Sequence, residues 1–168
     1  MVLTMFCSGA SLYAQTNPAT VILVRHSEKA LEPKDNPPLS EAGRARAAAV
    51  VEMLRHAGVD AVYHSNRVRT HETARALGDS LRVPLVEVPL SKLEPWVADI
   101  VGRVRKDCGG RVCVVVGHSN TYGPVIEAFG GPKIEEIVEE RYDDMIILTV
   151  QDGKPTRMIR AKYGERWK

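Results

Sequence analysis

Three short stretches of the sequence place basic side chains directly after apolar runs. Arg25 and His26 follow the run "VILV", Arg69 comes soon after "DAVYHS", and His118 follows "RVCVVVG". Guanidinium groups match the oxygens of a phosphoryl group, and a neutral imidazole attacks phosphorus as a nucleophile. These residue types therefore indicate chemistry on a phosphate group.

A parallel sheet is needed to bring those side chains together. Residues 21–24 and 112–116 are continuous apolar runs of the kind found in central strands that are covered on both faces. Residues 60–65 and 83–88 are shorter candidates of the same kind. Because loops that leave the carboxyl ends of parallel strands meet at one edge of a sheet, we expect the histidines and arginines to share one pocket.

Helical patterns lie between the predicted strands. Ser40 is suited to cap a helix that stops at Gly58, and Pro95 suits the first turn of a later helix. The residues expected to face the core are Ala47, Val50, Val51 and Leu54 in the first helix, Ala74, Leu77 and Leu81 in the second, and Val97, Ile100, Val101 and Val104 in the third.

The C-terminal third predicts two further elements. "MIILTV", the turn "QDGK" and "TRMIRAKYG" indicate an antiparallel hairpin at one edge of the sheet. The stretch "KIEEIVEERYDD" (133–144) is interpreted as a solvated acidic helix. Alternation of strands and helices predicts a three-layer α/β/α sandwich whose central sheet is mostly parallel, with the antiparallel hairpin at its edge.

Composition bounds the class of protein. The 168 residues suit one domain, and a net charge of +2 with scattered basic residues argues against nucleic-acid binding. No apolar run is close to the length of about 20 residues that a membrane-spanning helix needs. The cysteine and histidine spacing indicates no metal site, and the sequence leaves the oligomeric state open.

The N-terminal residues and the cysteines bear on the compartment. Residues 1–19 are interpreted as a leader cut near Ala14, although the first basic residue of the sequence is Arg25 and the positive start of a typical leader is missing. This leaves residues 20–168 as the domain and predicts export, with a cytoplasmic location as the alternative. An oxidising compartment would permit a disulfide between Cys108 and Cys113, but buried free thiols are the simpler interpretation.

Four motifs stand in a fixed order along the chain: "RHSEK" (25–29), "LSEAGRARA" (39–47), "SNRVRTHETA" (65–74) and "VVVGHSNT" (114–121). Together they resemble the histidine phosphatase superfamily, also called the phosphoglycerate mutase-like family. The resemblance runs from about residue 20 to the C-terminus. It implies a phosphoglycerate mutase-like fold and phosphoryl transfer without a metal or an organic cofactor.

The resemblance also implies roles for the matching residues. His26 would be the nucleophile that becomes phosphorylated, and Arg25 and Arg69 would hold the phosphoryl group. His118 would donate a hydrogen bond to that group and stabilise its charge. The register of the third motif selects Arg69 rather than Arg67, which we place on the rim of the pocket.

The residue that protonates the leaving oxygen is less clearly marked. The family tends to use a carboxylic acid for this step, and we select Glu94, with Asp99, Glu87 and Asp79 as rivals. Ser119 directly follows the second histidine, where the phytase-like branch of the family has Asp. We therefore disfavour that branch and assign Ser119 to phosphate binding.

The sequence thus predicts a phosphoric monoester hydrolase of the histidine acid phosphatase type, acting on a phosphorylated small molecule or on a phosphoprotein. A mutase-type phosphotransferase and a phosphohistidine-protein phosphatase share the motifs and are kept as alternatives. "RHSEK" lacks a mutase-like continuation, which favours hydrolysis. A non-enzymatic anion-binding module is the third alternative. His56, His64 and His71 are interpreted as surface or capping residues, with His64 nearest the pocket.

Overall fold

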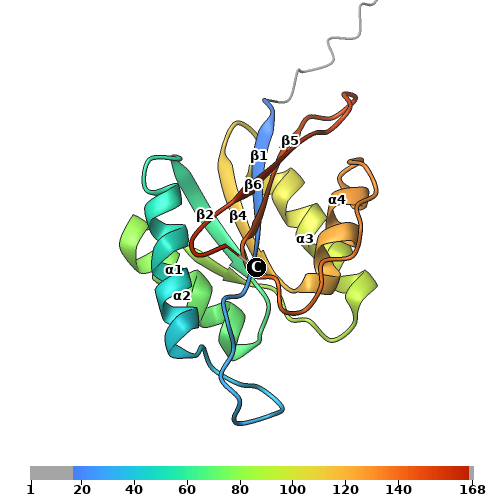
Figure 1. Ribbon diagram of the computed structural model, residues 1–168. Coiled ribbons are helices and arrows are strands. Elements are labelled where there is room, and N and C mark those ends of the chain that lie inside the picture. The colour runs from blue at the N-terminus through green and yellow to red at the C-terminus, as the bar shows by residue number, and fades with distance from the viewer. Residues whose placement is uncertain (1–16, 167–168) are drawn as a thin grey trace, which may run out of the picture.

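A computed structural model describes residues 17–166 and shows a six-stranded sheet between two pairs of helices (Figure 1). The strands are β1 (Ala19–Arg25), β2 (Val59–His64), β3 (Leu85–Glu87), β4 (Val112–Gly117), β5 (Asp144–Val150) and β6 (Arg157–Lys162). They are ordered β3-β2-β4-β1-β5-β6. Strands β1 to β4 are mutually parallel, and β5 is antiparallel to both β1 and β6. The predicted sandwich with its edge hairpin is confirmed.

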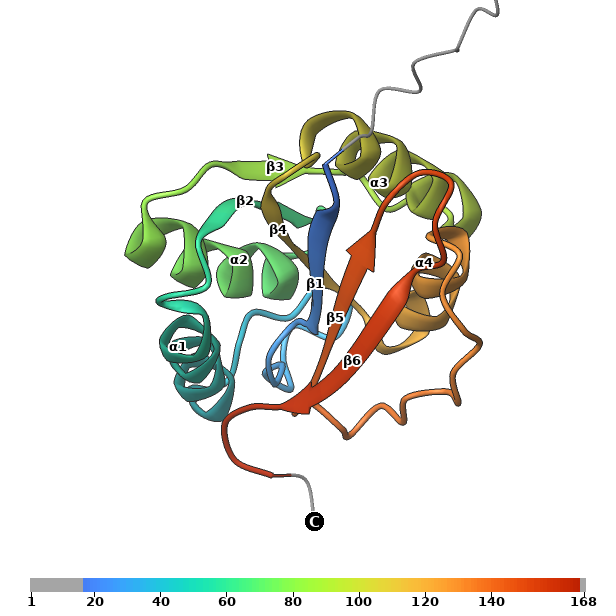
Figure 2. The same cartoon turned by 90° about the horizontal axis from the view of Figure 1, so that it is seen from above.

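The helices are α1 (Glu41–Leu54), α2 (Val68–Leu81), α3 (Leu93–Asp107) and α4 (Tyr122–Ala128). Helices α1 and α2 cover one face of the sheet, and α3 and α4 cover the other (Figure 2). The predicted cap is present, because the Ser40 hydroxyl accepts a hydrogen bond of 3.0 Å from the Gly43 amide. None of the helices within residues 17–166 is long and apolar enough to cross a membrane.

The central strands are buried on both faces because the pleat sends alternate residues to opposite helix pairs. In β1, Ile22 and Val24 pack toward α1 and α2, whereas Val21 and Leu23 pack toward α3 and α4. The pattern "VILV" therefore supplies both cores at once. Because this run forms the buried part of β1, the residues that follow it, Arg25 and His26, lie at the carboxyl edge of the sheet.

The prediction of a helix over residues 133–144 is wrong. Residues 131–138 and 141–143 have no regular secondary structure, and the chain runs as an irregular segment from α4 to β5 (Figure 2). Ile137 is buried in the core on the side of α3 and α4. Carbonyl groups of this segment bind the Arg25 side chain, so they are not available for helical hydrogen bonds.

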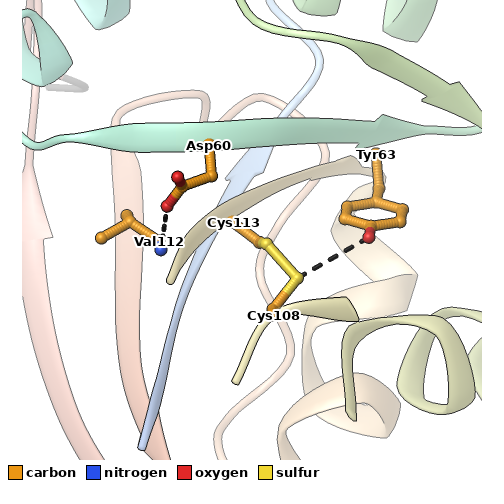
Figure 3. The surroundings of a disulfide bond; sticks show 5 residues. All are labelled: Asp60, Tyr63, Cys108, Val112 and Cys113. Atoms are coloured by element: carbon orange, nitrogen blue, oxygen red, sulfur yellow. Dashed lines mark hydrogen bonds between the residues drawn. A yellow bond between two sulfur atoms is a disulfide. The ribbon is translucent and has the colours of Figure 1, made fainter. Parts of the chain in front are cut away.

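The prediction of free thiols is also wrong. Cys108 and Cys113 form a disulfide that joins the end of α3 to β4 across the Gly-Gly turn (Figure 3). Both residues are buried, and the Tyr63 hydroxyl lies 3.6 Å from the Cys108 sulfur. The local spacing permitted this pair, since the Cα atoms of a disulfide are usually about 4.4–6.8 Å apart and here they are 6.3 Å apart.

Gly43 offers a test of how α1 packs against the segment that follows β1. A Cβ atom at this position would lie 2.1 Å from the carbonyl oxygen of Glu28, which is backbone and has no room to yield. Gly43→Ala is therefore expected to lower the free energy of unfolding by about 1–3 kcal/mol in urea titrations.

Gly102→Ala is the matched control, because it also lies in a helix but has no neighbour within 4 Å of the added Cβ. The control should be neutral or stabilising by about 0.5–1 kcal/mol, since alanine favours the helix. Equal effects of the two substitutions would contradict the packing described for Gly43.

Candidate active site

The register of the sheet brings the two motif histidines together. Arg25 pairs with Gly117 across β1 and β4, and the His26 amide donates a 3.0 Å hydrogen bond to the Gly117 carbonyl. His26 and His118 therefore leave neighbouring parallel strands at the same level. Ser65 follows β2 at this edge, as expected for the carboxyl ends of parallel strands.

The two imidazole rings lie edge to face inside the protein. Their centroids are 5.2 Å apart, and the side chains of His26 and His118 belong to residues that are only 3% and 7% exposed. The Nδ1 atom of His26 is 2.8 Å from the Ser27 carbonyl oxygen. Because a carbonyl only accepts, Nδ1 carries the proton, and Nε2 keeps its lone pair as a nucleophile requires.

The surroundings of His26 keep this ring neutral. Burial lowers its pKa from 6.5 to about 2, and the nearby charges of Arg25 and Arg69 act in the same direction. The hydrogen bond to the Ser27 carbonyl opposes this shift but does not cancel it. A neutral His26 is the form with a free lone pair across the whole physiological pH range.

A chain of hydroxyl groups orients His118. Its Nε2 atom lies 2.9 Å from the Ser65 hydroxyl, which lies 2.8 Å from the Thr70 hydroxyl. The Thr70 hydroxyl donates to a backbone carbonyl, that of Ser65 or Arg67, so it accepts from Ser65. Ser65 in turn accepts from His118, and we assign the proton of His118 to Nε2 on this basis.

The other ring nitrogen of His118 faces the cations. Nδ1 lies 3.5 Å from the Arg69 Nη2 atom, a long contact in which the guanidinium donates. Burial first, and then the charges of Arg69, Arg25 and Arg67, together lower the pKa of His118 to about 3. Ser65 belongs to the third motif, but no role was predicted for it from the sequence. Its position at the end of a predicted strand was the feature that could have marked it as a residue of the site.

Both arginines keep a hydrogen-bond donor without an acceptor in the described part of the chain. Arg25 is 2% exposed and Arg69 is half-buried. Within residues 17–166, the Nε atoms of both are buried and have no hydrogen-bond partner. Burial also lowers the pKa of each guanidinium. A tetrahedral oxyanion is the acceptor that two such forks and two imidazoles fit.

The segment between α4 and β5 completes the surroundings of Arg25. The Arg25 Nη1 atom donates to the carbonyls of Val138 at 3.3 Å, of Glu139, and of Arg141 at 3.2 Å. The Tyr142 ring stacks on the guanidinium, with 4.1 Å from Cζ to the ring centroid. Sequence reasoning missed these contacts, because backbone carbonyls more than a hundred residues away leave no local signature.

Helix α2 ties the loop after β1 to the third motif. The Thr73 hydroxyl accepts a 3.0 Å hydrogen bond from the Ser27 amide and donates to the Arg69 carbonyl at 2.8 Å. The Glu72 carboxylate accepts from the Leu39 amide at 2.7 Å. These contacts hold Arg69 and the His26 loop as one unit.

The remaining candidates occupy different positions. Arg67 is exposed next to the start of α2, where its charge reaches Arg69 and His118, as expected for a rim residue. Ser119 begins the short 3-10 helix η1 (Ser119–Thr121) directly after His118. Glu94 is exposed in the first turn of α3. The roles of Ser119 and Glu94 stay predictions.

His64 is not the surface residue that the sequence suggested. It is 2% exposed at the end of β2, and its Nδ1 atom lies 2.8 Å from the Ser65 carbonyl oxygen. Its ring packs edge to face on that of His71 with centroids 5.1 Å apart. His56 and His71 are exposed, as expected. In the described part of the chain, no three His, Cys, Asp or Glu residues are placed to hold a metal ion.

Comparisons with known proteins give one match to a family model and several solved structures of similar fold. Residues 21–93 match the model of the histidine phosphatase superfamily (branch 1). The fold is similar to that of the protein histidine phosphatase SixA complexed with tungstate (16% identity, TM-score 0.67, 85% of this chain and 96% of that chain covered). No curated protein matches the sequence.

Two further solved structures share the fold. YhfR of Bacillus stearothermophilus has 16% identity and a TM-score of 0.65, with 82% of this chain and 94% of that chain covered. The mycobacterial glucosyl-3-phosphoglycerate phosphatase in complex with VO3 has 13% identity and a TM-score of 0.64, with 87% of this chain and 100% of that chain covered.

The lowered pKa values of His26 and His118 predict how stability depends on pH. Below about pH 6.5 the unfolded chain protonates these rings whereas the folded protein does not, so stability is complete above that pH and falls as the pH drops toward the folded values. Each ring should contribute up to about 1.4 kcal/mol of loss per pH unit.

The measurement is urea unfolding between about pH 7 and about pH 5, in buffers free of phosphate and sulfate. His118→Gln should show a shallower loss of stability than the wild type. The exposed His56→Gln is the control and should follow the wild type. A His118→Gln protein with the wild-type slope would show that this ring is not held neutral by the fold.

Proposed function

We propose, from the premise that this chain belongs to the histidine phosphatase superfamily, that it hydrolyses a phosphorylated substrate through a phosphohistidine intermediate on His26. The observation that carries the proposal is the pair of buried imidazoles 5.2 Å apart, flanked by two arginines whose Nε atoms are buried and unpartnered within residues 17–166. An arrangement of this kind suits one phosphoryl group.

The first chemical step uses the lone pair on Nε2 of His26. This nitrogen attacks phosphorus, so the P–N bond forms as the bond from phosphorus to the leaving oxygen breaks, and the leaving oxygen takes a proton from an acid. In the second step water attacks phosphorus, the P–N bond breaks, and inorganic phosphate leaves. Arg25 and Arg69 stabilise the charge on the equatorial oxygens in both steps.

Binding of the phosphoryl group would change the charge of His118. A dianion within about 4–6 Å raises the pKa of an imidazole, because opposite charge favours the protonated form. The Ser65 hydroxyl already accepts the proton on Nε2, so the added proton goes to Nδ1 on the side of Arg69. The protonated ring then donates to an oxygen of the substrate, as the sequence resemblance implied.

The substrate class has two candidates within the same chemistry. One is a phosphomonoester of a small molecule, as acted on by the mycobacterial glucosyl-3-phosphoglycerate phosphatase that shares the fold. The other is a protein phosphorylated on histidine, which the likeness to SixA favours. A mutase would form the same phosphohistidine but would return the phosphoryl group to an organic acceptor, so release of inorganic phosphate separates it from both.

The proposal includes export from the cytoplasm. Its support is the buried disulfide between Cys108 and Cys113, because disulfides persist in oxidising compartments and are rare in the cytosol. The interpreted leader, residues 1–19, lies almost wholly outside the residues that the structure describes.

His26→Ala tests the identity of the nucleophile. Hydrolysis of a generic aryl phosphate at mildly acidic pH should fall by more than about a thousandfold, because no P–N bond can form. His56→Ala is the matched control, since that histidine is exposed and outside the site. Phosphate release is measured with the aryl phosphate and with a histidine-phosphorylated protein, and retained turnover in His26→Ala would sink the proposed intermediate.

Glu94→Gln tests the proposed acid. An alkyl phosphate has a basic leaving oxygen that needs a proton, so kcat on this substrate should fall by about a hundredfold or more. An aryl phosphate with an acidic phenol should change only a few-fold. Asp79→Asn, a rival carboxylate on α2, serves as the control. Equal effects of Glu94→Gln on the two esters would exclude Glu94 as the acid.

A further inference from the structure

Tyr142 contacts both groups on which the proposed reaction depends. Its ring stacks on the Arg25 guanidinium at 4.1 Å from Cζ to centroid. The same ring lies edge to face against His26, with centroids 5.9 Å apart and an interplanar angle of 61°. One side chain from the segment before β5 therefore touches the nucleophile and its neighbouring cation.

The hydrogen bonds of Arg25 hold one side of its guanidinium group. Its Nη1 atom is held by backbone carbonyls of the segment that leads to Tyr142, those of Val138, Glu139 and Arg141. Its buried Nε atom has no partner in the described part of the chain. With Nη1 bound to main-chain carbonyls, the buried Nε is a donor of this guanidinium that has no acceptor within residues 17–166.

The stacked ring fixes the remaining freedom of this guanidinium. Carbonyl bonds to Nη1 alone leave the guanidinium plane free to tilt, whereas a ring face 4.1 Å from Cζ restrains it by cation–π attraction. The ring also covers a cation whose burial lowers its pKa, and Tyr142 is among the groups that oppose this shift.

The main chain around Tyr142 is anchored on both sides. Asp143 and Asp144, which follow it, are 2% exposed and pair with Lys162 at 2.8 Å. Before it, the Glu139 carboxylate pairs with Lys29 at 2.5 Å. Ion pairs on both sides therefore anchor the main chain around the ring, through buried aspartates after it and an exposed Lys29–Glu139 pair before it.

We infer that Tyr142 is a positioning residue that sets the affinity of the site for phosphate by holding the Arg25 guanidinium beside His26. The inference rests on the proposed function, since it assigns a role toward the same oxyanion. It names a residue that no motif of the sequence marks. A purely structural role would instead place Tyr142 among residues that affect folding but not anion affinity.

The test measures vanadate binding by calorimetry and by inhibition of aryl phosphate hydrolysis. Tyr142→Leu removes the ring face but keeps apolar bulk, and it should weaken vanadate binding about tenfold and raise KM similarly. Tyr142→Phe keeps the face and should stay within about threefold of the wild type, and Tyr142→Trp should bind at least as tightly as the wild type. Melting temperatures are recorded for each variant.

Each outcome decides the question. Weakened binding in Tyr142→Leu with a near-wild-type melting temperature, together with retained binding in the two aromatic variants, supports the inference. Unchanged binding in Tyr142→Leu, or a tenfold loss in Tyr142→Phe, overturns it. Should Tyr142→Leu fail to fold, the two aromatic variants decide alone. A wild-type protein that neither binds vanadate nor hydrolyses the ester would instead refute the proposed function.

Discussion

Two guanidinium groups and two imidazoles lie close together at the buried carboxyl edge of a parallel sheet. The other contacts of the site compensate for the cost of placing these groups side by side. Charges of one sign repel each other and lose hydration when buried. Both imidazoles respond by staying neutral, with pKa values lowered to about 2 and about 3. Arg25 responds by taking backbone carbonyls as acceptors. We propose that a tetrahedral anion such as phosphate relieves the repulsion that is left.

The fold provides this arrangement through strand register. Because β1 and β4 pair with Arg25 opposite Gly117, each histidine follows its strand at the same level. Hydroxyl groups then set the rings: Ser65 orients His118, and Thr73 holds the loop that carries His26. The chemistry therefore depends on backbone pairing first and on short polar side chains second.

Much of this was predictable from the sequence, because local patterns determine it. Continuous β-branched runs marked β1 and β4, Ser40 marked the start of α1, and the residues after each strand marked the site. The segment 133–144 was wrongly predicted to be a helix. Its carbonyl groups accept hydrogen bonds from Arg25, and Ile137 is buried in the core, so the segment is irregular instead. Such demands come from residues more than a hundred positions away. The contacts of Tyr142 were missed, and Cys108 and Cys113 were wrongly predicted to be free thiols. In both cases the residues that come into contact are determined by the tertiary structure.

The central claim is that Arg25, Arg69, His26 and His118 together enclose one oxyanion. A crystal structure of the protein soaked with tungstate tests it most directly. We expect tungsten to lie in line with Nε2 of His26, with tungstate oxygens within hydrogen-bond distance of both arginines and of Nδ1 of His118. Tungstate bound elsewhere, or a His26 ring whose Nε2 points away from the bound anion, would contradict the account.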